Sequence, residues 1–130
     1  TLTVRPGSTR EKRDSVMQDW HRSLLHEVVP GLIRTWEAKL GVNVAGYFLQ
    51  RMKTKWGGCN HRERNIRLNT ELVKKSKDLL EYVVVHEMLH LIEPTHSARF
   101  TAMLAKYYPS WQAARMELND LPLGAEQWRE

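Results

Sequence analysis

A chain of 130 residues has the size of one domain, and its 42% hydrophobic content is enough to bury a modest core. No segment approaches the roughly 20 apolar residues that cross a bilayer, and residues 1–10 lack the layout of a secretory signal. The single cysteine, Cys59, excludes an internal disulfide. These features exclude membrane-spanning and disulfide-rich classes, and they predict a soluble, cytoplasmic protein of one domain.

The net charge of +5 is concentrated in one segment, because residues 51–67 hold six basic residues against Glu63 alone and the rest of the chain is balanced. Such a patch suits an anionic partner, for example a nucleic acid or a nucleotide. Solvated charge on a hairpin is the commoner cause, so both interpretations stay open. The six basic residues are Arg51, Lys53, Lys55, Arg62, Arg64 and Arg67.

The first predicted element is a long amphipathic helix that begins after Ser8 or Thr9, either of which can cap it. Pro30 and Gly31 should kink or split this helix, because proline removes a backbone donor. Gly41 should end it. Its apolar face is predicted from residues that recur at every fourth position, namely Val16, Trp20, Leu24, Val28, Leu32 and Trp36.

Two strand-like segments follow the helix. Residues 42–49 are rich in strand-forming types, and a second apolar alternation comes after the turn-like, charged run 61–65. A small antiparallel sheet around residues 56–69 is therefore expected.

Three more helices are expected after the sheet. Asp78 with Glu81 three residues later resembles a capping box, so the second helix should begin near Leu79. A third helix covers residues 98–108, and a short fourth helix restarts after Pro109 and runs to Leu118.

The helix predicted to begin near Leu79 carries the H-E-x-x-H motif of zinc hydrolases, as His86-Glu87-Met88-Leu89-His90. Residues four apart project from the same side of a helix, so His86 and His90 can bind one metal ion. Glu87 is then placed to contact a water beside the metal as general base. The alternative, that these are ordinary polar residues, would leave costly polar groups on an otherwise apolar helix.

A catalytic zinc site needs a third protein ligand, and His96 is the candidate. Pro94 disfavours helix at the residue before it, so the helix should end near Ile92 and the chain should turn back. The spacing equals that of the metzincin motif, but Glu93 replaces the metzincin glycine and Met103 lies in a helical pattern, so a true metzincin is not expected. Glu93 is interpreted as an exposed turn carboxylate, with a second-shell partner or a competing ligand as alternatives.

The mechanism expected for such a site is hydrolysis of a carbonyl or phosphoryl centre, in which zinc lowers the pKa of water and Glu87 accepts the proton. A donor for the developing oxyanion is also expected, and the sequence does not choose among Tyr107, Tyr108, Arg99 and Arg115. The other three histidines lack such partners and are predicted to be surface residues: His21, His26 and His61.

The chain resembles the YgjP-like metallopeptidase family. The match rests on residues 53–60 (KTKWGGCN), 66–69 (IRLN), 82–91 (YVVVHEMLHL), His96-Ser97, Phe100, Pro109 and Trp111. This resemblance implies a zincin-like α+β fold, with a small antiparallel sheet packed on a long N-terminal helix and on the H-E-x-x-H helix. It also implies zinc on His86, His90 and His96, with Glu87 as the catalytic glutamate. Gly58 departs from the serine that is usual in the family's W-G-S-C segment.

Family members usually carry a strand-rich region upstream, and this chain begins without methionine. Residues 1–130 are therefore expected to be one zincin-like domain from the C-terminal part of a longer protein. By analogy with zincins, Trp56–Asn60 or Ile66–Asn69 could pair with an extended peptide, although packing of Trp56 and Cys59 is the commoner role. Cys59 is not expected to act as a nucleophile, since no base is placed beside it.

The leading hypothesis is thus a cytoplasmic zinc peptidase with a peptide or protein substrate. The alternatives are a zinc-dependent nucleotide pyrophosphatase, or a DNA-associated protease of the SprT-like kind, either of which would use the basic residues 51–67. A non-catalytic zinc-binding module is a further alternative, but structural zinc sites normally close with four protein ligands. Cobalt, nickel or iron could also occupy three imidazoles.

Overall fold

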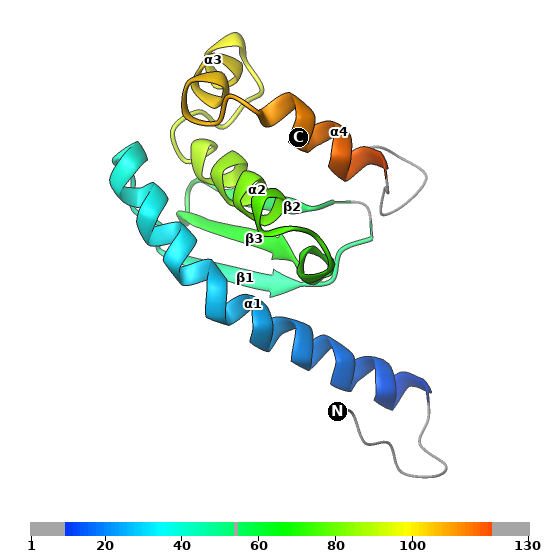
Figure 1. The fold of residues 1–130 in the computed structure, drawn as a ribbon. Helices are drawn as coiled ribbons and strands as arrows, with labels where there is room; N and C mark the ends of the chain where they lie inside the picture. Colours follow the sequence, from blue (N-terminus) through cyan, green and yellow to red (C-terminus); the bar gives the residue numbers. More distant parts are fainter. Residues whose placement is uncertain (1–9, 54, 121–130) are drawn as a thin grey trace.

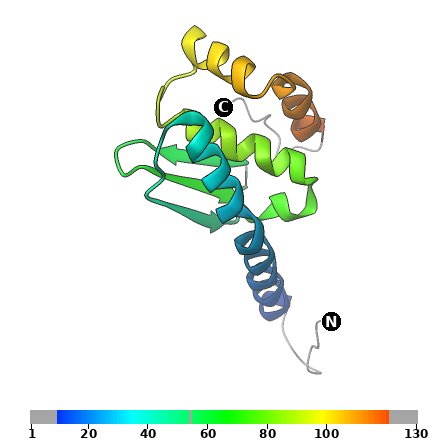
Figure 2. The same cartoon turned by 60° about the vertical axis from the view of Figure 1, so that its left-hand side comes forward.

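The computed structural model describes residues 10–53 and 55–120. Four α-helices and a three-stranded sheet form an α+β fold, which confirms the predicted class, and α1 and α2 pack on the sheet while α3 and α4 pack on α2 (Figures 1 and 2). The elements in chain order are α1 (Arg10–Leu40), β1 (Gly46–Gln50), β2 (Gly57–Asn60), β3 (Asn65–Asn69), the 3-10 helix η1 (Thr70–Lys74), α2 (Lys77–Leu89), α3 (Ala98–Tyr107) and α4 (Trp111–Asp120).

The sheet is mixed: the antiparallel pairing predicted around residues 56–69 is confirmed for β2 and β3, and β1 adds a parallel pairing that was not predicted. Its strand order is β1-β3-β2, in which β3 pairs with β2 antiparallel and with β1 parallel. Ile66 and Leu68 of β3 are completely buried, which favours the central place for this strand. After the hairpin turn at residues 61–64, strand β3 lies between β1 and β2. This strand order could not be deduced from the local alternation of apolar residues.

The predicted turn between β2 and β3 is confirmed in its place and in its chemistry. The side-chain oxygen of Asn60 accepts hydrogen bonds from the backbone N–H groups of Arg62 and Glu63, at 3.2 and 3.1 Å. Arg64 then adopts a left-handed conformation with φ of 58°. This Asx-type turn fixes the register that pairs Gly58 with Arg67.

Helix α1 continues through Pro30, so of the two predicted outcomes, a kink or a split, the split is wrong. Gly41 ends the helix with φ of 70° and donates its N–H to the carbonyl of Glu37, as predicted. The first half of α1 extends beyond the sheet (Figure 1), and Val16 and Trp20 are half exposed there. The buried face lies over the second half of the helix and is formed by Leu25, Val29, Leu32, Ile33 and Trp36.

Helix α2 is the central element of the core, since every residue from Tyr82 to His90 is buried. Its N-cap is Ser76, whose hydroxyl accepts from the N–H of Leu79, so the predicted capping role of Asp78 is wrong and Asp78 lies in the first turn. The helix ends at Leu89, three residues earlier than expected. Helices α3 and α4 agree with the prediction within two residues.

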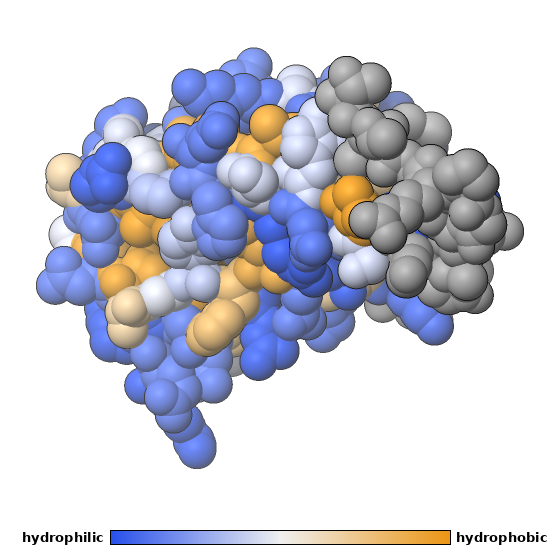
Figure 3. Space-filling model, turned by 90° about the horizontal axis from the view of Figure 1, so that it is seen from below, coloured by the Kyte–Doolittle hydropathy of each residue, from blue (hydrophilic) through white to orange (hydrophobic). Residues whose placement is uncertain are grey.

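The described surface is mixed in character. Seen from below, hydrophobic residues form separate patches among hydrophilic ones (Figure 3). Among the described residues, none of the helices is long and apolar enough to cross a membrane. The predicted caps Ser8 and Thr9 lie outside the described residues.

Candidate metal centre

Helix α2 brings the H-E-x-x-H residues to its C-terminal end. His86, Glu87 and His90 are 2%, 0% and 6% exposed. His90 is the C-cap of the helix and keeps helical angles, with φ of −66° and ψ of −16°, so the spacing of four residues still places both imidazoles on one side. Their Nε2 atoms lie 3.3 Å apart.

A tight turn after α2 brings His96 to the same point. The carboxylate of Glu93 accepts from the backbone N–H and the hydroxyl of Thr95, and Ser97 then caps α3. One nitrogen from each of His86, His90 and His96 lies within 4.8 Å of the other two, the only such group of possible ligands found in the described part of the chain. His96 is exposed, whereas the two helical histidines are buried.

The spacing of the two helical histidines fits a tetrahedral ion. Two imidazole nitrogens, each about 2.0 to 2.1 Å from a tetrahedral zinc, are about 3.3 to 3.4 Å apart. The spacing of 3.3 Å between His86 Nε2 and His90 Nε2 matches this value. His86 and His90 therefore have the spacing of two zinc ligands, and His96 adds a third imidazole within 4.8 Å of them.

The surroundings keep the imidazoles in the form that binds metal. His90 Nδ1 lies 3.1 Å from the backbone carbonyl oxygen of Glu93, and because a carbonyl only accepts, this nitrogen carries the proton and Nε2 keeps its lone pair. Burial, followed by the neighbouring His90 and His96, lowers the pKa of His86 to about 2. His86 is therefore neutral at physiological pH.

Phe100 of α3 packs against all three histidines. Its ring stacks on that of His90, with centroids 4.3 Å apart and an angle of 13° between the planes. It also makes T-shaped contacts with His86 and His96, at centroid distances of 5.1 and 5.3 Å. Phe100 is 2% exposed. The sequence identified Phe100 as one of the residues that match the family, but its contact with the three rings could not be deduced.

Glu87 is covered by the first residue of β2. A Cβ atom on Gly57 would lie 2.8 Å from Glu87 Oε2, 2.9 Å from Val83 Cγ1 and 3.0 Å from Glu87 Cγ. Only glycine therefore lets β2 approach the carboxylate so closely. A Cβ on Gly58, the next residue, would meet nothing within 4 Å.

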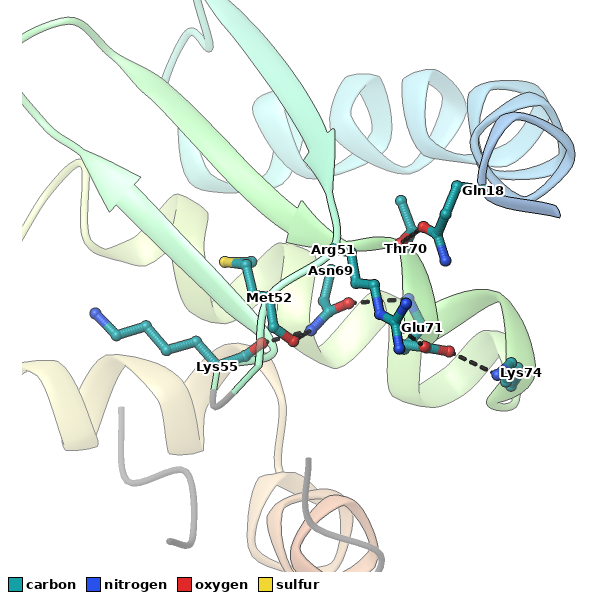
Figure 4. Close-up of polar contacts among 8 residues, drawn as sticks. All are labelled: Gln18, Arg51, Met52, Lys55, Asn69, Thr70, Glu71 and Lys74. Carbon is teal, nitrogen blue, oxygen red and sulfur yellow. Dashed lines mark hydrogen bonds and ion pairs between the residues drawn. The ribbon is translucent and has the colours of Figure 1, made fainter. Parts of the chain in front are cut away.

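The segment before β2 is held in place by one buried amide. Asn69 donates from Nδ2 to the backbone carbonyls of Met52 and Lys55, at 2.8 and 2.7 Å, while its oxygen accepts from the N–H of Glu71 (Figure 4). The N–H of Asn69 also donates to the carbonyl of Trp56. These bonds tie Met52, Lys55 and Trp56 to the end of β3 and so position Gly57 beside Glu87.

We expect Gly57→Ala to lower kcat for peptide cleavage about 10-fold to 100-fold, because displacing a reacting group by about 1 Å can cost that much. Zinc content should stay near that of the wild type, since the added methyl group points at Glu87 and Val83 rather than at a histidine. Overpacking should also cost about 1 to 3 kcal/mol of stability. Steady-state kinetics, metal analysis and thermal melting measure these three effects.

Gly58→Ala is the matched control for this substitution, because the same methyl group meets open space. It should leave kcat within about twofold of the wild type. Equal losses in the two variants would show that the close approach to Glu87 is not the cause.

A cavity of about 590 Å³ opens beside Glu87, His90 and His96. Its opposite wall is formed by β2 and the hairpin that follows, including Cys59, Asn60 and His61. Strand β2 lies at the edge of the sheet, so it can pair with an extended peptide, whereas Ile66–Asn69 in the central strand cannot. Of the two predicted substrate edges, only Trp56–Asn60 is compatible with the fold.

None of the four predicted oxyanion donors is among the residues that line this cavity. Tyr108 donates its hydroxyl to the carbonyl of Asp78, in the first turn of α2. Arg99 lies 3.8 Å from the carboxylate of Glu93. The remaining candidates, Tyr107 and Arg115, line other surface pockets.

Three further predictions concern His61, His21 and Cys59. His61 is exposed as predicted, yet it lines the cavity, a role that its sequence position directly after β2 could have suggested. His21 is 6% exposed, so its predicted surface position is wrong. Burial and the nearby Glu87 carboxylate raise the pKa of Cys59 to about 12, so the thiol stays protonated, in agreement with its predicted inertness.

The basic residues 51–67 do not form one continuous patch of free charge. Lys55, Arg62 and Arg67 line the cavity. Arg51 pairs with Glu71 at 3.7 Å, and Arg64 donates to the carbonyl of Asn43. The patch is thus divided between the cavity wall and contacts that stabilise loops.

The model of one protein family, YgjP-like, metallopeptidase domain, matches residues 1–121. This chain belongs to the YgjP-like metallopeptidase family. Membership makes it a hydrolase of the metallopeptidase class, and the resemblance noted in the sequence is confirmed. A comparison with curated proteins gives no match.

Two solved structures share the YgjP-like fold of this chain. The metallopeptidase zymogen of Methanocaldococcus jannaschii jannalysin is 20% identical with a TM-score of 0.59, and the match covers 68% of this chain and 91% of jannalysin. The metallopeptidase zymogen of Pyrococcus abyssi abylysin is 19% identical with a TM-score of 0.63, covering 69% and 90%. At these identities the likeness establishes the fold.

Proposed function

We propose that this domain is a zinc peptidase in which His86, His90 and His96 hold the metal and Glu87 is the general base. The observation that carries the proposal is the convergence of three imidazole nitrogens within 4.8 Å beside an open cavity. Three protein ligands leave one position of a tetrahedral ion open to water or substrate. Cobalt, nickel or iron would suit the same donors, and zinc is preferred because three imidazoles are typical of it.

Bound zinc would polarise the scissile carbonyl and lower the pKa of the attacking water. Glu87 accepts the proton of that water and returns it to the leaving amine. Its complete burial excludes bulk solvent from the carboxylate, and Gly57 and Val83 restrict its movement. The free edge of β2 orients the peptide backbone, and Phe100 holds the three imidazoles. We place this activity in the cytoplasm, since a lone cysteine gives no need for an oxidising compartment.

Removal and return of the metal test this function. Protein stripped with a chelator should cleave no peptide in a mixed peptide library, and about one equivalent of zinc per chain should restore cleavage. Elemental analysis and mass spectrometry of the products measure both quantities. Cleavage that survives complete removal of metal would contradict the proposal, and stoichiometric zinc without any turnover would favour a non-catalytic module.

A hydrolase of a phosphate-bearing substrate is the second candidate, because Arg62 and Arg67 line the same cavity. A DNA-associated protease is less well supported, since the basic residues 51–67 are divided between the cavity and loop contacts. Assays of the zinc-loaded protein on nucleoside triphosphates, beside the peptide library, separate these activities.

A further inference from the structure

The two walls of the cavity differ in charge. One wall carries His90, His96 and Glu87, and the carboxylate of Glu87 is completely buried. The other wall carries three side chains that are cationic at neutral pH, and Glu87 is the only acidic residue among the described residues that line the cavity. The three cations are Lys55, Arg62 and Arg67. The cavity therefore attracts an anion to the same space that the candidate metal ligands line.

The position of Arg67 follows from the register of the sheet. Arg67 of β3 lies opposite Gly58 of β2, and its side chain is exposed, whereas its neighbours Ile66 and Leu68 are buried. Because Gly58 has no side chain, nothing on the edge strand stands between Arg67 and the cavity that it lines. Arg62 reaches the same cavity from the hairpin, where Asn60 holds its backbone.

Neither of these guanidinium groups has a partner in the part of the chain that the structure describes. Among the described residues, Arg62 and Arg67 make no side-chain hydrogen bond or ion pair, while Arg51 and Arg99 pair with Glu71 and Glu93. An arginine that lines a cavity without an acidic partner can bind a carboxylate with two parallel hydrogen bonds.

We propose that Arg62 and Arg67 bind a carboxylate of the substrate peptide next to the bond that is cleaved. This inference rests on the proposed peptidase function, and it names the substrate class as acidic peptides. A carboxylate is the anion that peptides carry, either on aspartate and glutamate side chains or at the C-terminus. The free edge of β2 would align the backbone of the substrate peptide so that one end of the peptide lies beside these two arginines.

The test uses zinc-loaded protein and fluorogenic peptides of one sequence. Glutamate or glutamine is placed at each position in turn in peptides with an amidated C-terminus, and a second set carries a free C-terminal carboxylate. The enzymes are the wild type, Arg62→Gln, Arg67→Gln and the double variant, with Arg34→Gln as a matched control because Arg34 is an exposed arginine of α1 outside the cavity. Thermal melting shows that each variant is folded.

The wild type should cleave the best acidic peptide about 10-fold to 100-fold faster in kcat/KM than its neutral twin, as expected for charge-assisted hydrogen bonds. The double variant should cleave the acidic peptide and its neutral twin with equal kcat/KM, whereas Arg34→Gln should keep the wild-type preference. Preference for glutamate identifies a side-chain carboxylate, and preference for the free C-terminus identifies the terminal one. Either result supports the proposal.

Equal cleavage of acidic and neutral peptides by the wild type overturns this inference and leaves the peptidase function standing. If no peptide is cleaved, the proposed function fails, and fluorescence anisotropy of the labelled peptides decides the inference. Acidic peptides that bind the wild type and not the double variant then support it, and binding without charge preference overturns it. Hydrolysis of a nucleoside triphosphate that depends on Arg62 and Arg67 also overturns it.

Discussion

Glu87→Gln is expected to lower kcat for peptide cleavage about 10²-fold to 10⁴-fold while the protein keeps its zinc. General-base catalysis contributes about 10²-fold to 10⁴-fold, and glutamine cannot accept the proton. Glutamine has nearly the same size as glutamate, so the variant should fit below Gly57 without displacing β2. Steady-state kinetics and elemental analysis of the same preparation measure the two effects together.

Glu93→Gln is the control for this variant, since Glu93 lies close to the histidines but its side chain is used by Thr95 and Arg99. The backbone carbonyl that holds His90 is unchanged by the substitution. Turnover and zinc content should stay within about threefold of the wild type. A large loss of zinc in Glu93→Gln would instead favour Glu93 as a competing ligand, and a Glu87→Gln variant with normal kcat would exclude Glu87 as the base.

Local sequence patterns predicted the helices and the ligand residues. The H-E-x-x-H spacing needs only the geometry of one helix, and Pro94 acts on the backbone of the residue before it. His96 could therefore be predicted as the third candidate ligand, because it lies six residues after His90 and beyond the turn expected at Pro94. These features depend on neighbours in sequence, which is why they could be seen without a structure.

Features that depend on distant segments could not be seen in this way. The central place of β3 depends on its parallel pairing with β1, which sets Gly46 opposite Asn65. The approach of Gly57 to Glu87 joins residues thirty positions apart, and no local pattern separates Gly57 from Gly58. The oxyanion donors were sought downstream of the motif, whereas the cavity is completed by β2 and its hairpin, upstream.

The end of α2 shows how tertiary contacts shift a local expectation. The apolar run continues to Ile92, yet the regular helix ends at Leu89 and the next residues donate to carbonyls three residues back. This tighter turn brings the carbonyl of Glu93 to His90 Nδ1. The early end thus provides the acceptor that fixes the tautomer of a candidate ligand.

His96→Ala is expected to lower zinc affinity by more than about 100-fold and to abolish peptide cleavage. Changes to residues that only orient a ligand already cost about 10-fold to 100-fold in metal affinity, so loss of a ligand should cost more. His96 is exposed and lies in a turn, so its removal should leave the apoprotein folded. A competition titration with a zinc chelator gives the affinity, and circular dichroism tests the fold.

His61→Ala provides the matched comparison, because His61 is also exposed and lines the same cavity but lies outside the group of three histidines. It should keep zinc affinity within about twofold of the wild type. Equal losses of zinc in the two variants would show that His61 of the hairpin also contributes to metal binding. Loss in His96→Ala alone assigns the third ligand to the turn after α2, and it leaves His61 free to contact the substrate.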